Sequence, residues 1–89
     1  NGTFIKIGAL SADAVLVGIS GGNDGRLLIV YNSDTADELR IAHDSSSEST
    51  AANRIYTMTG SNVDITARGT AMFIYDVGAD RWILINVNP

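Results

Sequence analysis

Short runs of branched and aromatic residues, separated by clusters of Gly, Asn, Asp and Ser, recur along the whole chain. In the first run, residues 3–10, apolar and polar positions alternate with a period of two, which is typical of a half-buried β-strand. β-Branched and aromatic side chains favour strands, and the small polar residues between the runs favour turns. The pattern predicts an all-β fold with strands at residues 3–10, 14–19, 26–32, 39–43, 53–57, 62–66, 70–75 and 81–87.

About eight short strands with frequent turn signals are typical of a small antiparallel β-sandwich or a barrel-like roll. The runs at 70–75 and 81–87 are joined by residues that include Gly78, which predicts a β-hairpin. Residues 44–52 form the longest segment without strand character; we expect a loop, with one helical turn over residues 48–53 as the alternative. A chain of 89 residues has room for a single domain. Residues 1–10 are expected as a strand or an arm, and the chain could be part of a longer one.

Three of the predicted strands, at residues 27–31, 70–75 and 82–87, carry apolar side chains on both faces. A two-layer sandwich covers only one face of each sheet, and the chain is too short to supply a third layer. We therefore expect another copy of the chain to cover the second face. The residues expected at this subunit interface are Leu28, Val30, Met72, Ile74, Ile83 and Ile85.

The composition disfavours several classes of binding partner. The chain is 45% hydrophobic, carries a formal net charge of −4 and has no cysteine. An acidic chain is a poor binder of nucleic acid or of an anionic membrane surface. Without cysteine there is no disulfide and no thiolate metal site. No run of about 18 apolar residues is present, so we expect no membrane insertion.

Few side chains have the pattern of a reactive or binding site. His43, Asp44 and the serines at 45–49 are the residue types of a nucleophilic triad, but they are contiguous, and we interpret them as a loop. The aspartates fall mostly singly in separate turns, which favours turn capping over calcium binding. We expect no catalytic residue, metal or cofactor. Trp82, Tyr56 and His43 are candidate glycan contacts, with ordinary core or interface packing as the alternative for the aromatic residues.

Five short blocks in a fixed order give the chain a recognisable pattern. They are the glycine-rich turn at residues 19–26, a strand end at 28–32, residues 41–43 with 53–55, the run at 69–76, and the pair at 81–82. This order resembles a small β domain of bacteriophage virion proteins, chiefly tail fibres and related appendages. In the first block we expect a structural turn made by Gly21, Gly22, Asp24, Gly25 and Arg26, in which glycine permits backbone angles closed to other residues.

The resemblance implies a non-enzymatic building unit on the virion surface, commonly a homotrimer. The expected partners are copies of the same chain, other virion proteins and a host-surface glycan. A monomeric carbohydrate-binding module and a capsid decoration protein are the alternatives. The resemblance brings no catalytic residues. Within its blocks we expect Asp24 and Arg26 to form a charged pair across the turn, and Arg54 or Arg81 to pair with Asp76 or Asp80.

Overall fold

The computed structural model describes residues 2–7 and 14–88, and it confirms an all-β fold with all eight predicted strands. The strands are β1 Gly2–Ile7, β2 Ala14–Leu16, β3 Leu27–Asn32, β4 Leu39–Ile41, β5 Ile55–Tyr56, β6 Val63–Ile65, β7 Thr70–Asp76 and β8 Arg81–Asn88. The end of the first predicted strand, residues 8–10, lies outside the described residues. One 3₁₀ turn, η1 Ala51–Asn53, lies at the end of the predicted loop, and no helix of the described chain is long and apolar enough to cross a membrane.

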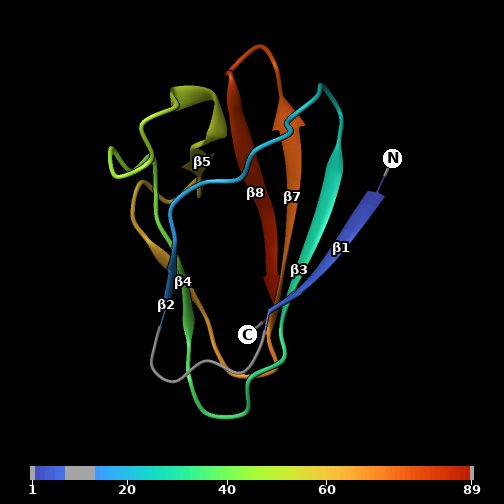
Figure 1. Ribbon diagram of the computed structural model, residues 1–89, viewed down its shortest axis with the longest axis vertical. Helices are drawn as coiled ribbons and strands as arrows, with labels where there is room; N and C mark the ends of the chain where they lie inside the picture. The colour runs from blue at the N-terminus through green and yellow to red at the C-terminus, as the bar shows by residue number, and fades with distance from the viewer. Residues whose placement is uncertain (1, 8–13, 89) are drawn as a thin grey trace.

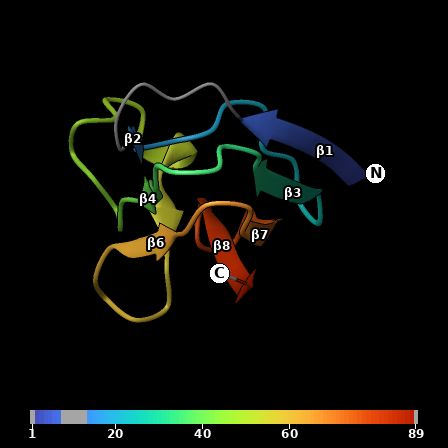
Figure 2. The ribbon, with the colours of Figure 1, turned by 90° about the horizontal axis from the view of Figure 1, so that it is seen from below.

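The strands form two sheets that face each other (Figures 1 and 2). The larger sheet has the order β1-β3-β7-β8-β5, and the smaller sheet has the order β2-β4-β6. The described strands therefore form an open sandwich of two sheets. The alternative prediction, a barrel-like roll, is wrong for the described strands. At its start the chain alternates between the sheets, because β1 and β3 lie in one and β2 and β4 in the other.

The expectation of an antiparallel sandwich is wrong for half of the strand pairs that the structure describes. β1 pairs with β3, β2 with β4, and β5 with β8 in parallel, whereas β3–β7, β4–β6 and β7–β8 are antiparallel. Parallel neighbours need a long crossover between them. Here each crossover from β1 to β3 and from β2 to β4 passes through a strand of the opposite sheet, so the chain returns in its original direction.

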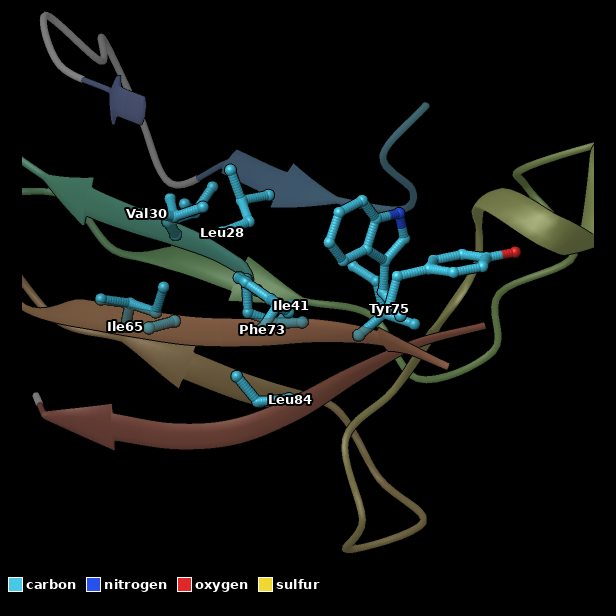
Figure 3. Packing of buried hydrophobic residues seen from close by; sticks show 11 residues of the cluster. Leu28, Val30, Ile41, Ile65, Phe73, Tyr75 and Leu84 are labelled. Atoms are coloured by element: carbon cyan, nitrogen blue, oxygen red, sulfur yellow. The ribbon is translucent and has the colours of Figure 1, made fainter. Parts of the chain in front are cut away.

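The core lies between the two sheets. Along β7 and the first half of β8, side chains alternate between buried and partly buried, as the period of a strand requires. Figure 3 shows labelled side chains of both sheets gathered in the space between them. The cluster consists of Leu28, Val30, Ile55, Ala71, Phe73, Tyr75, Trp82 and Leu84 from the larger sheet, and Leu39, Ile41 and Ile65 from the smaller. Full burial of one large apolar side chain contributes about 1.5–3 kcal/mol.

Two of the residues predicted at a subunit interface belong to this core instead. Leu28 and Val30 are 2% and 1% exposed, so they are covered within the single chain. The reason is the pairing of β3 with β7, which places Leu28 opposite the buried Phe73 and Ile29 opposite Met72. Directly paired residues of an antiparallel ladder lie on the same face. The outward face of β3 therefore carries the alternate side chains, those of Leu27, Ile29 and Tyr31.

A single buried amide ties the end of β3 to the smaller sheet. Asn32 is fully buried, and its Nδ2 lies 3.0 Å from the carbonyl of Asp37, 3.3 Å from that of Ile65 and 3.2 Å from that of Thr66. Its Oδ1 accepts the backbone N–H of Asp34 at 3.1 Å. Buried polar groups must find such partners to offset the loss of water. The amide does so by binding the strand end of β6 and the turn before β4.

Candidate functional site

The outward face of β3, β7 and β8 presents apolar side chains in register across the three strands. In register, Leu27 lies opposite Ile74, which lies opposite Ile83, and these three form one row across the strands. Next to this row, Ile29 lies opposite Met72. These five side chains are all partly buried, because neighbours on the same face shield one another. We call them, together with Tyr31, the outer apolar face.

The outer apolar face carries no charge at its centre. Its next row pairs Tyr31 with Thr70 and Asn88, so the surface becomes polar toward one end of the strands. At the other end Asp76 lies opposite Arg81, and these charged residues border the face. Met72, Ile74 and Ile83 thus lie on an outward face as predicted, whereas Leu28 and Val30 are replaced there by the alternate residues of the same strand.

Ile85, the last residue predicted at the interface, has a different position. The β7–β8 ladder pairs Phe73 with Leu84 and Met72 with Asn86, which leaves Ile85 as the extra residue of a β-bulge. Its side chain is 49% exposed and lines a groove at the edge of the sandwich. Ile85 is therefore separate from the outer apolar face.

Aromatic and charged side chains meet where β4, β5 and β8 come together. The rings of His43 and Tyr56 are stacked with centroids 5.6 Å apart, and the Arg81 guanidinium carbon lies 5.2 Å from the centre of the Tyr56 ring. Arg81 Nε donates to Asp44 Oδ1 at 2.9 Å, which raises the pKa of the guanidinium while partial burial opposes that shift. Arg81 thus forms its ion pair with Asp44, 37 positions away in sequence, and bonds Asp80 through the backbone carbonyl of that residue. Arg54 Nε donates instead to the Glu48 carbonyl at 3.0 Å.

The structure separates the three predicted glycan contacts. Trp82 is 1% exposed and its Nε1 donates to the carbonyl of Ile19 at 2.9 Å, so its indole cannot stack on a sugar, and this prediction is wrong. A second reason is its edge-to-face contact with Tyr75 in the core, at 5.3 Å between centroids. His43 and Tyr56 are partly exposed, but each ring already packs against the other.

The imidazole of His43 is engaged with the backbone. Its Nδ1 accepts the N–H of Thr57 at 3.1 Å and lies 3.2 Å from the Thr57 hydroxyl. In the serine loop that follows, Ser45 Oγ accepts the N–H of Ser47, which is the capping role that its sequence suggests. No group of three or more metal-binding side chains gathers anywhere in residues 2–7 and 14–88.

The glycine-rich turn adopts the special conformations expected of it at two positions. Gly21 and Gly25 have φ angles of +85° and +78°. Gly22 is required for a different reason, because a β-carbon there would meet the ring of Tyr75 at 2.2 Å. The two charged residues hold the turn through backbone groups: Arg26 Nη1 donates to the Gly21 carbonyl at 2.9 Å, and Asp24 Oδ1 accepts the N–H of Val77 at 3.1 Å. The turn is thereby attached to the β7–β8 hairpin.

Sequence reasoning missed two buried polar residues, Asn32 and Thr57. Asn32 ends β3 and Thr57 follows β5. At such positions an isolated Asn or Thr is typical of a turn. No family model matches the chain, and no curated protein or solved structure is similar enough to show common descent. The geometry of the described residues therefore provides the basis for assigning a function.

Proposed function

We propose that this chain is a non-enzymatic structural module of a bacteriophage virion appendage, such as a tail fibre, that assembles as a homotrimer. The observation that carries the proposal is the outer apolar face, whose row of Leu27, Ile74 and Ile83 contains no charged residue. The rest of the chain gives a net charge of −4. Like-charged copies repel each other, so an uncharged face is the surface on which they can approach most closely.

The block resemblance supports the virion assignment, and three of its five blocks have a structural task in the fold. The glycine-rich turn attaches to the β7–β8 hairpin, and the strand end at Asn32 joins the two sheets. The final pair, Arg81 and Trp82, provides an ion pair and a core anchor. Residues with such tasks are typical of a building unit rather than of a reactive site.

Sedimentation analysis of the wild-type chain and two lysine variants tests self-association. Ile74→Lys places a charge in the outer apolar face, and Val15→Lys is the matched control because Val15 is 57% exposed on the smaller sheet. We expect wild-type and Val15→Lys trimers at micromolar concentration and a monomeric Ile74→Lys, since a buried unpaired charge costs several kcal/mol. Circular dichroism checks that both variants fold. A wild-type chain that stays monomeric would contradict the proposal.

Particle purification tests the virion assignment. Peptides of this chain should travel with phage particles through a density gradient and should label the particle surface with specific antiserum. Recovery of the chain in the soluble fraction alone would contradict a virion location. Capsid decoration and appendage locations give different labelling patterns by electron microscopy.

A monomeric carbohydrate-binding module is less well supported by the geometry. With Trp82 in the core, the candidate contacts are reduced to Tyr56 and His43. The Tyr56 ring is in contact with both His43 and Arg81, so a sugar has to compete with these side chains for it. Host-glycan contact therefore enters the proposal only as a secondary role of the assembled module, tested by loss of glycan binding in Tyr56→Ala.

A further inference from the structure

The larger sheet ends in two different strand edges. On one side is β1, which pairs with β3 and with no other described strand. On the other side β5 covers only the beginning of β8, because Ile55 pairs with Trp82 and Tyr56 with Ile83 (Figure 1). Among the described residues no strand covers Leu84–Asn88 on that side. An uncovered edge presents backbone N–H and C=O groups that can pair with another strand.

β5 is short because the chain turns away immediately after it. The N–H of Thr57 donates to His43 Nδ1 at 3.1 Å, and its hydroxyl donates to the Ser61 carbonyl at 2.6 Å. Met58 follows with a φ of +70°, a left-handed conformation that interrupts an extended strand. The edge of β8 beyond Ile83 is thus left open by specific hydrogen bonds of the neighbouring loop.

A groove of about 370 Å³ runs beside this open edge. Its apolar walls are formed by Met58, Val63, Leu84, Ile85 and Val87. Met58 and Ile85 are 70% and 49% exposed, which is unusual for side chains of this size. A backbone edge beside apolar pockets is the arrangement that binds an added β-strand, since the edge provides hydrogen bonds and the pockets provide side-chain contacts.

The open segment lacks two of the usual devices that protect a strand edge, charge and proline, but it carries a third, a bulge. Natural edge strands carry lysine, other charges, proline or a bulge to prevent pairing. Leu84–Asn88 has the sequence LINVN, with no charge and no proline. Its bulge at Ile85 turns a large apolar side chain into the groove. The bulge twists the edge, but the absence of charge and the apolar side chain in the groove leave this segment able to accept another strand.

We propose that the open edge of β8 and its groove receive strand β1 of a second copy of this chain. β1 has six residues, enough to span the five open residues of β8. Both belong to the same sheet, so their pairing continues the sheet from one copy to the next, and closure of three copies into a ring buries the outer apolar faces around the common axis. The two edges differ, so the contact is heterologous and closes into a ring or extends as a filament. This inference rests on the proposed self-association and names the interface.

Lysine substitution at the edge tests the interface in the full chain. Ile85→Lys and Met58→Lys should each weaken association at least tenfold, because a charge must then enter the groove. Val77→Lys is the control, since Val77 is 59% exposed in the turn at the opposite end of β8 and should have no effect. If the wild type assembles and Ile74→Lys dissociates it, but neither edge variant changes the affinity, the edge proposal is wrong and the proposed function stands. A monomeric wild type overturns both.

Disulfide trapping identifies which strands meet. The chain has no cysteine, so single-cysteine variants give unambiguous crosslinks. Ile85→Cys mixed with Thr3→Cys, Phe4→Cys or Lys6→Cys in turn should yield a crosslinked pair of the two different variants for at least one β1 position. Rapid crosslinking of Ile85→Cys to itself, with no mixed product, would mean that two β8 edges pair and would overturn the proposal.

Discussion

Replacing Asn32 by Asp tests the idea that one buried amide holds the two sheets together. The side chains have nearly the same shape, so packing changes little. The amide nitrogen, however, faces the carbonyl oxygens of Asp37, Ile65 and Thr66 at 3.0–3.3 Å. In Asn32→Asp an oxygen replaces this nitrogen, so a donor becomes an acceptor that faces three other acceptors.

The size of the effect follows from the hydrogen bonds. An amide has two N–H groups, so the three carbonyls share about two donor bonds, and Oδ1 accepts a third bond from the N–H of Asp34. Each bond contributes about 0.5–1.5 kcal/mol net, so Asn32→Ala should cost roughly 2–4 kcal/mol. An unpaired buried charge costs about 3–5 kcal/mol, so Asn32→Asp should cost more at neutral pH. The total free energy of unfolding of a chain of this size is only about 4–13 kcal/mol.

The cost of Asn32→Asp should depend on pH in a defined direction. Burial among carbonyls raises the pKa of the introduced carboxyl above its unfolded value of about 3.9. The free energy of unfolding of the variant therefore falls as pH rises from the unfolded pKa to the folded pKa of this carboxyl. The loss of stability becomes smaller on acidification. Urea unfolding followed by fluorescence of the single, buried Trp82 measures it at pH 4 and pH 7. Asn86→Asp is the exposed control. Equal costs at both pH values would show that the introduced carboxylate is not an unpaired buried charge.

Three further predictions concern single contacts. Gly22→Ala should cost about 1–3 kcal/mol and lower the melting temperature, because its methyl group meets the Tyr75 ring at 2.2 Å. Asp64→Asn should cost no more than about 1 kcal/mol at pH 7, since its ion pair with Arg40 is exposed. The hydrogen bond from Arg40 lowers the pKa of Asp64, so the pair stabilises the fold above pH 3.8, and the difference between the two chains should vanish as the pH falls below the lowered pKa. Trp82→Phe should cost about 2–4 kcal/mol by urea unfolding and circular dichroism, because a core contact and an indole N–H bond are lost.

The outer apolar face illustrates a partial success of sequence reasoning. Apolar residues on both faces of the strands at 27–31 and 70–75 correctly indicated that an outward face is apolar. They could not show which alternate set faces outward, because either phase of β3 is equally apolar. The pairing of Leu28 with Phe73 decides it, and that pairing is a property of the folded sheet. The prediction for Ile85 failed for a similar reason. A bulge shifts the register of β8 at this residue, and the local sequence pattern gives no signal of a bulge.

Eight strands and the positions of their turns were determined by the sequence itself, because a period of two and residues such as Gly21 and Gly25 act locally on the backbone. Only the tertiary structure decided that half of the described strand pairs are parallel, since direction depends on where a crossover runs. The burial of Asn32 and Trp82 was decided in the same way. Apart from the local bonds of Asn32 to Asp34 and Asp37, their hydrogen-bond partners are 33 to 63 positions distant in sequence, and such contacts exist only when two sheets close around them.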